Sequence, residues 1–289
     1  MKRLHLLFPL TLAFGIAGYS AEPSPDKSSF NLFNPTPASL LRELSTDRPD
    51  KTECPFTVDA GHLQLEMDWA VFSRDHESDN TIDTQVEAWS LAAVNIKVGL
   101  TNRSDFQCVI EPLLQVTTTD RVAQTTTTER VRGFGDITLR YKWNFWGNEG
   151  ASSALAVMPF VKLPTAKTGL GNDSVEGGVI LPYSRDLPNG WGLGVQLEVD
   201  IMRDEGGDDL HAEYVGSVTV GHDLTKDLGG YIEVFSQHSA EHGVPWVGTF
   251  DLGLTYAVSS NVQWDAGANL GLSDSAPDVE FFTGIALRF

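Results

Sequence analysis

The sequence has few cysteines and few basic residues, and each shortage excludes a class of protein. Cys54 and Cys108 are the only cysteines in 289 residues, so neither a disulfide framework nor a Cys-x-x-Cys zinc ribbon can form. The 20 lysines and arginines stand against 39 aspartates and glutamates, which gives a formal net charge of −19. Nucleic acid is excluded as a partner, because phosphate backbones are bound by a basic face.

Long hydrophobic runs are also missing, except at the N-terminus. Lys2 and Arg3 precede an apolar run over residues 4–17, and small residues follow at positions 18–21. This order is typical of a secretory signal peptide, which we place at residues 1–21. The run of about 14 residues is shorter than the ~20 needed for a spanning helix, so a signal anchor is the weaker alternative.

The segment after the signal peptide has the composition of an extended chain. Residues 22–56 are rich in proline, serine, asparagine and charged residues. Such a segment has too few apolar residues to form a packed core of its own. We therefore predict a periplasmic N-terminal arm at residues 22–56, followed by a single β-domain at residues 57–289.

Apolar and polar residues alternate with a period of two through this β-domain. In its first segment Leu63 and Leu65 share one face, and Gln64 and Glu66 share the other. Successive side chains of a strand point to opposite faces, so each segment has one apolar and one polar side. The pattern predicts about twelve strands, each close to the 9–11 residues that cross a bilayer when tilted. They lie at residues 61–71, 86–100, 106–116, 137–145, 155–163, 175–183, 191–201, 210–220, 228–234, 246–258, 262–272 and 279–289.

Three features favour a membrane barrel over a soluble sandwich. The predicted strands are about twice as long as the five or six residues of soluble strands. Aromatic residues such as Trp143, Trp191 and Trp264 lie near segment ends, as in the interfacial girdles of outer-membrane barrels. Short links alternate with long ones, such as residues 73–83 and 117–132, like periplasmic turns and outer loops. The predicted fold is an all-β, antiparallel, up-and-down transmembrane barrel in the bacterial outer membrane, surrounded by its lipids.

The last strand ends in an aromatic residue. Phe281, Ile285, Leu287 and Phe289 alternate with other side chains up to the terminus. The ending resembles the C-terminal assembly signal of bacterial outer-membrane proteins. We therefore predict the barrel-assembly machinery as a partner that reads Phe289; an ordinary strand that happens to end in phenylalanine is the alternative.

Several short motifs, correct in order, resemble one bacterial family. They are Ser-Thr-Asp-Arg-Pro-Asp at residues 45–50, Gly-His-Leu-Gln-Leu-Glu at 61–66, Gly-Phe-Gly-Asp at 133–136, and Pro-Phe-Val-Lys-Leu-Pro-Thr at 159–165 followed by Lys-Thr-Gly-Leu-Gly at 167–171. The chain from about Ser45 to Phe289 resembles the outer-membrane transporters of the meta-pathway (MetA-type) phenol-degradation group. The sequence departs from that group at Asp50 and Cys54, where glycine or serine is common. The resemblance implies an outer-membrane channel that takes up aromatic or hydrophobic compounds.

The polar face of the strands is predicted to line the lumen. The predicted lumen-lining residues are Glu66, Asp68, Glu87, Glu111, Asp136, Arg140, Lys142, Lys162, Glu198, Asp200, Asp251 and Asp265. Acidic residues predominate in this set, so an open lumen is expected to favour cations. A barrel of about twelve strands is only moderately wide, and side chains together with the arm could instead plug it. The sequence leaves an open pore and a plugged lumen as alternatives.

Motifs for catalysis and cofactors are weak. His76 and Ser78 lie in an acidic loop, and Gly133 and Gly135 lack the third glycine and the helix of a dinucleotide-binding loop. We predict no enzyme activity, no cofactor and no metal site; a disulfide between the two cysteines is left open. The sequence predicts a porin-like channel for small solutes. The alternatives are a structural or adhesin-like barrel and, more weakly, an outer-membrane hydrolase.

Overall fold

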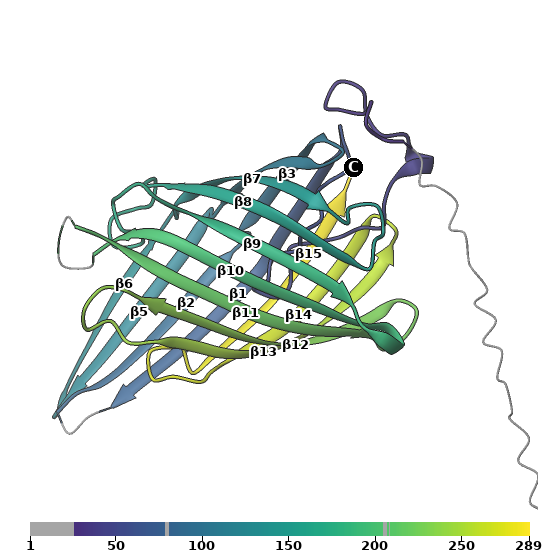
Figure 1. Cartoon of the computed structure of the whole chain (residues 1–289). Coiled ribbons are helices and arrows are strands. Elements are labelled where there is room, and N and C mark those ends of the chain that lie inside the picture. Colours follow the sequence, from purple (N-terminus) through teal and green to yellow (C-terminus); the bar gives the residue numbers. More distant parts are fainter. Residues whose placement is uncertain (1–25, 79–80, 205–206, 208) are drawn as a thin grey trace, which may run out of the picture.

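A computed structural model describes residues 26–78, 81–204, 207 and 209–289. Its strands form one sheet that closes on itself, because β1 pairs with β15 as well as with its sequence neighbours (Figure 1). The strands are β1 (Leu63–Ser78), β2 (Asp83–Leu91), β3 (Val94–Thr101), β4 (Ser104–Ile110), β5 (Leu113–Val122), β6 (Thr125–Gly133), β7 (Ile137–Trp146), β8 (Ser153–Leu163), β9 (Glu176–Asp186), β10 (Trp191–Arg203), β11 (Leu210–Asp223), β12 (Leu228–Ser239), β13 (Val247–Ser259), β14 (Val262–Gly271) and β15 (Val279–Arg288). Two short 3-10 helices, η1 (Ala38–Leu40) and η2 (Pro188–Gly190), complete the elements.

Three pairs of these strands are halves of single membrane spans. The first half of β1 (residues 63–67) pairs with β3, and the second half (residues 70–78) pairs with β2. β2 and β3 therefore lie end to end in one membrane span. The same holds for β4 with β5 and for β6 with β7. Counting each pair as one span leaves twelve antiparallel spans, and the predicted fold class is confirmed.

Each interruption has a local cause in the sequence. Between β2 and β3, Ala92 adopts a φ of 58°, a left-handed conformation that breaks the ladder. Between β4 and β5, Pro112 lacks the N–H that a strand needs. Between β6 and β7, Gly135 lies so close to Glu111 that a Cβ there would be 2.5 Å from the Glu111 carboxylate. The three breaks lie in adjacent spans, so this side of the wall bends.

The barrel is apolar outside and polar inside. On β10, Leu197, Val199 and Ile201 are exposed outward, whereas Gln196 and Asp200 are buried in the interior. This is the reverse of a soluble protein and matches a wall surrounded by lipid. Aromatic side chains such as Trp143 and Trp264 are exposed on the same outer face, at the strand ends.

The connections between strands are short at one end of the barrel and long at the other. The C-terminus and the arm lie at one end, and the long hairpins of β1, β2, β5 and β6 extend from the opposite end (Figure 1). The end with the C-terminus carries the short turns and is the periplasmic end. Among the described residues no helix is long and apolar enough to cross a membrane. The predicted signal peptide, residues 1–21, lies outside the described residues.

Two segments predicted as outer loops are partly strand. β1 continues to Ser78, and β5 and β6 form a hairpin within residues 113–133 where a loop was expected over 117–132. The hairpin contains the run Thr125–Thr128, and β-branched residues favour extended conformations. Both cysteines are free: Cys54 lies in the arm inside the barrel, and Cys108 lies on the outward face of β4 between Phe106 and Ile110.

Candidate functional site: the lumen and its N-terminal arm

The arm enters the barrel instead of remaining outside it. Residues 46–58, here called the lumen segment, run through the interior in an irregular extended conformation. At its start the Asp47 carboxylate accepts hydrogen bonds from the Lys97 and Lys142 ammonium groups at 2.6 and 2.5 Å. The Asp47 backbone N–H donates to the Glu66 carboxylate at 3.1 Å. All four residues are buried, so this is a desolvated charge cluster that joins the arm to β1, β3 and β7.

Arg48 joins the arm to the seam where the first and last strands meet. Its guanidinium donates two hydrogen bonds to Asp265 on β14, at 2.7 and 2.9 Å, and one to Asp68 on β1, at 2.8 Å. Two parallel bonds to one carboxylate are the strongest geometry for such a pair. The guanidinium lies over Gly284 of β15, where a Cβ would be 2.1 Å from the Arg48 Nη2 atom. A glycine at position 284 therefore makes room for Arg48.

The middle of the lumen segment contacts the part of the wall formed by β12 and β13. The Lys51 ammonium group bonds the Thr249 hydroxyl at 2.7 Å and lies 3.3 Å from the Asp251 carboxylate. Backbone N–H groups of Lys51 and Thr52 both donate to Glu233 at 2.8 Å. The acidic wall of β12 and β13 therefore binds both the charge and the backbone of the arm.

The next residues contact a basic strip. The Glu53 carboxylate accepts a hydrogen bond from Arg140 at 2.6 Å. The backbone oxygens of Cys54 and Pro55 accept from Lys142 at 2.7 Å and Asn144 at 2.9 Å. An irregular segment can remain inside a barrel only when its backbone polar groups are paired in this way.

Charge in the arm and charge in the wall are complementary along the path. Basic arm residues meet acidic wall residues, and acidic arm residues meet basic ones. Within the lumen segment, all of which the structure describes, Asp50 lies in no spanning strand and forms no ion pair; it lies beside Glu233. Burial and this neighbouring carboxylate raise the pKa of Asp50 to about 8. Asp50 therefore stays protonated near neutral pH while the arm is inside the barrel.

Most of the predicted lumen residues project inward, and half of them contact the arm. The residues that contact the arm are Glu66, Asp68, Arg140, Lys142, Asp251 and Asp265. Lys162 instead pairs with Glu176 at 2.5 Å. On the neighbouring strand, the Glu198 carboxylate accepts a hydrogen bond from Gln196 at 2.7 Å, and Asp200 is buried two residues further along the same face.

Two predicted residues lie in the strand breaks, and one lies on the wrong face. Glu111 and Asp136 are in the interruptions of the bent wall, where Asp136 accepts hydrogen bonds from the backbone N–H groups of Thr165 and Ala166, both at 2.9 Å. Glu87 shares its strand face with Trp89, whose ring packs against Phe72 on the outer side of the wall. The prediction that Glu87 lines the lumen is wrong, because the break at residue 92 shifts the alternation by one.

The charged residues of the lumen segment were not among the site residues predicted from the sequence. Asp47, Arg48, Lys51 and Glu53 lie in the seven-residue stretch 47–53, which was predicted only as part of an extended arm rich in charged residues. The signal was present, because charges of both signs alternate there, as they must to meet an interior with acidic and basic sectors. The pattern could be matched to the barrel interior only once it was known which wall residues point inward.

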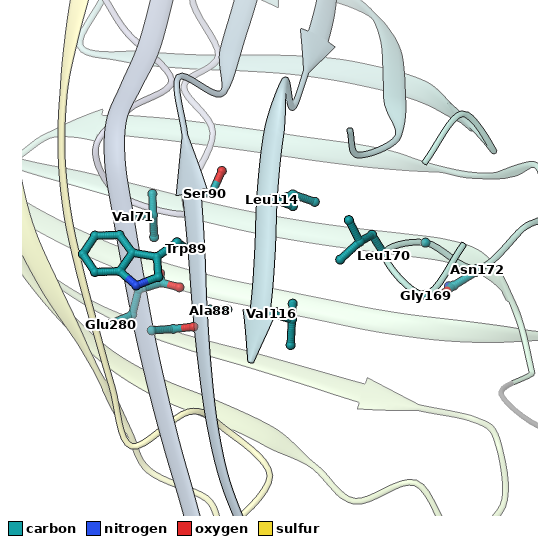
Figure 2. A pocket seen from close by; sticks show the side chains of 12 residues that line it. Val71, Ala88, Trp89, Ser90, Leu114, Val116, Gly169, Leu170, Asn172 and Glu280 are labelled. Carbon is teal, nitrogen blue, oxygen red and sulfur yellow. The ribbon is translucent and has the colours of Figure 1, made fainter. Parts of the chain in front are cut away.

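An apolar cavity lies in the outer half of the lumen, beside the bent wall. It has a volume of about 480 Å³ and is bordered by β1, β2, β5 and the loop that carries Leu170. Figure 2 shows Leu114 and Val116 projecting from β5 toward Leu170, while the Trp89 ring projects away from them. Val71 and Ala88 add further apolar surface, and Glu280 is the charged group at its edge. The cavity is large enough for one small aromatic molecule.

Comparison with known proteins agrees with this architecture. The structure is similar to the COG4313 outer membrane channel from Pseudomonas putida F1, with a TM-score of 0.58 and 12% identity over 85% of this chain and 100% of that chain. It also resembles the transport unit of the autotransporter AIDA-I from Escherichia coli, with a TM-score of 0.51 and 9% identity over 78% of this chain and 89% of that chain. No curated protein matches the sequence.

These likenesses establish the fold of an outer-membrane β-barrel. The sequence itself matches one family, described as "Putative MetA-pathway of phenol degradation", over residues 46–289. The match begins at the lumen segment, so it includes the arm that occupies the interior as well as the wall. The chain belongs to this phenol-degradation family of outer-membrane barrels.

Proposed function

We propose that the protein is a gated channel that carries small aromatic or hydrophobic compounds across the outer membrane. The observation that carries the proposal is the lumen segment, which lies in the interior and makes polar contacts to wall residues of β1, β3, β7, β12, β13 and β14. In this proposal the segment is a gate, and solutes pass when it leaves the lumen. The predicted acidic residues then act as the wall of the open pore.

The nature of the contacts supports a gate more than a permanent plug. The lumen segment is held by ion pairs and hydrogen bonds. It also has a cation–π contact, in which the Lys51 ammonium group lies 4.7 Å from the centroid of the Phe235 ring. Such contacts exchange readily for water, because water can solvate both partners once the segment moves. An apolar plug would lose the whole hydrophobic contribution on leaving.

The apolar cavity supports the choice of solute. Leu114, Val116 and Leu170 form an apolar surface within an interior that is otherwise charged. A small aromatic molecule would exchange water contacts for these side chains, which is favourable by roughly 25 cal/mol per Å² of apolar surface. The loop beside the cavity is fixed by Asp136, so the cavity is formed before a solute arrives.

Conductance in planar bilayers tests the gate. We expect the wild-type barrel to be closed most of the time and the double variant Arg48→Gln, Lys51→Gln to be open and cation-selective. The variant leaves Asp68, Asp265 and Asp251 without their arm partners, so the segment is held less tightly. Arg121→Gln is the matched control, because its ion pair with Asp83 at 3.2 Å is exposed in the outer hairpin.

A second readout distinguishes a released arm from a damaged wall. The Cys54 thiol is half-buried between Ser45 and Lys142, so it is expected to react slowly with maleimides while the arm is in the lumen. In a Cys108→Ser background, the double variant should be labelled at Cys54 several-fold faster than the parent. A double variant that stays closed and unlabelled would favour the structural or adhesin-like barrel.

The solute is tested by uptake of a small uncharged aromatic such as phenol into liposomes that contain the open variant. Replacing Leu170 with Asp should reduce that uptake while leaving ion conductance nearly unchanged, because it places a charge in the apolar cavity. Equal uptake of phenol and of a sugar of similar size, in both proteins, would contradict the assignment.

A further inference from the structure

Three side chains at the outer mouth of the barrel converge outside the site described above. Asp204 follows β10, His211 lies near the start of β11, and Glu241 follows β12. One donor atom from each lies within 4.8 Å of the other two. We propose that Asp204, His211 and Glu241 bind a first-row transition-metal dication such as Zn²⁺, which bridges two outer loops.

The donor set suits such an ion. Imidazole nitrogen with carboxylate oxygens is a combination that binds Zn²⁺, with metal–donor distances of about 2.0–2.2 Å. The Nδ1 atom of His211 is 2.7 Å from the Asp204 carboxylate and 3.7 Å from the Glu241 carboxylate. Small rearrangements of these side chains would place all three donors around one ion. Ca²⁺ and Mg²⁺ favour sites with oxygen donors alone, so the histidine argues against them.

The other nitrogen of His211 is positioned as in known metal sites. Metal-binding histidines commonly donate their second ring N–H to a carboxylate, which fixes the ring and selects the nitrogen that binds the ion. Here the Nε2 atom of His211 lies 3.4 Å from the Glu213 carboxylate, leaving Nδ1 for the metal. Glu213 is itself held by Gln237, which donates a hydrogen bond at 2.6 Å. This support orients the His211 ring so that Nδ1 faces Asp204 and Glu241.

The backbone holds the three residues in place from three adjacent strands. The Asp204 N–H donates to the Asp209 oxygen at 3.0 Å, which closes the outer connection between β10 and β11. The Ala240 N–H donates to the Ala212 oxygen at 2.8 Å, which extends the β11–β12 ladder to the residue before Glu241. His211 is largely buried between them, with 10% of its side chain exposed. A bound ion would therefore tie the loop after β10 to the loop after β12 at the mouth.

The proposal does not depend on whether the lumen conducts. Isothermal titration of the detergent-solubilised full-length protein with Zn²⁺ tests it directly, with Ca²⁺ as the comparison ion. We expect one Zn²⁺ per chain and at least tenfold weaker binding in His211→Ala. Glu213→Gln should weaken binding as well, because it removes the support of the ring. His242→Ala is the matched control, since this exposed neighbour lies outside the cluster.

A spectroscopic probe separates nitrogen coordination from simple charge attraction. With Co²⁺ in place of Zn²⁺, the wild type and His242→Ala should show visible absorption bands that saturate at one equivalent, and His211→Ala should not. Heat-modifiable migration on a gel verifies that each variant is a folded barrel. Equal Zn²⁺ affinity in wild type and His211→Ala, or tighter binding of Ca²⁺ than of Zn²⁺, would overturn the proposal.

Discussion

Arg48 shows how much one residue of the arm depends on the wall. Its guanidinium is held by carboxylates on the first strand and on the strand next to the last, and it occupies the space over Gly284. Breaking a buried pair by removing one partner costs about 3–5 kcal/mol, because the remaining charge is left unpaired. The closed state therefore depends on the size of side chain 284 as well as on the charges.

A substitution at that glycine tests the dependence. A Cβ at position 284 would also be 2.5 Å from the Met67 backbone oxygen of β1, but the Arg48 side chain can move more readily than that backbone. Gly284→Ala should therefore displace the Arg48 guanidinium from Asp265 and raise the fraction of time that the channel is open. Gly192→Ala is the control, since a Cβ at position 192 would meet nothing within 4 Å. Single-channel recordings of the two variants give the comparison, and equal open fractions would show that Arg48 adjusts without loss.

Asp50 predicts a dependence on pH. The pKa of its carboxyl is raised from 3.8 to about 8 when the arm is in the lumen and returns to its ordinary value when the arm is free in water. Below about pH 4 the group is protonated in both states, so it has no effect. Between about pH 4 and 8 only the free arm loses the proton, and the closed state is progressively destabilised.

The open fraction should therefore rise from pH 4 to pH 8 and change little above it. Asp50→Asn removes the titrating group and should flatten this part of the profile. Conductance recorded at symmetrical salt across that range provides the measurement. A profile that is unaltered in Asp50→Asn would assign the pH dependence to other carboxylates.

At the scale of the structural element, the bent wall and the loop after β8 are joined by hydrogen bonds and together form one side of the apolar cavity. The loop after β8 lies against the break between β6 and β7, where the Lys167 N–H donates to the Phe134 oxygen at 2.9 Å and Asp136 accepts hydrogen bonds from two backbone N–H groups of the loop. Lys167 adds a hydrogen bond from its ammonium group to the Arg132 backbone oxygen at 2.8 Å. The loop therefore forms one side of the apolar cavity, even though it belongs to no strand.

Removing that anchor should open the cavity side of the barrel. Asp136→Ala leaves the N–H groups of Thr165 and Ala166 without their acceptor, and because both groups are only partly buried the loss is at most about 1–3 kcal/mol. We expect faster proteolysis within residues 164–175 and weaker phenol uptake through the open variant, with the barrel still heat-modifiable. Asp120→Ala, in the outer hairpin, is the control; identical digestion patterns would count against the anchor.

At the scale of the whole molecule, the strands of the barrel wall could be predicted well from the sequence, whereas the arm inside the barrel could not. Strict alternation on strands such as β10 identified both the twelve spans and the inward position of Glu198 and Asp200, because pleat geometry links side-chain direction to sequence parity. Glu87 failed because a single left-handed residue, Ala92, reverses that parity. The path of the arm could not be predicted, since it depends on pairs that are close only after the barrel closes.

Assembly of the whole barrel is predicted to depend on its last residue. Phe289→Asp should slow insertion into the outer membrane, with accumulation of the unfolded form on a gel. The charge by itself would cost only about 0–1 kcal/mol near the interface, so a larger defect would indicate loss of recognition. Phe289→Tyr should behave almost as the wild type, and normal assembly of Phe289→Asp would contradict the role of this residue as a signal.

The bond between Arg48 and Asp265 joins residues 217 positions apart in the chain. Loss of Arg48 would leave Asp265 without two hydrogen bonds, and loss of Asp265 would leave Arg48 with Asp68 alone, so we expect the two residues to change together. Within the family, an arm that lost the arginine should be found with a wall that lost the aspartate. Asp47 with Lys97, and Glu53 with Arg140, should covary in the same way. Substitutions in the arm would then be accompanied by matching substitutions in the strands that surround it.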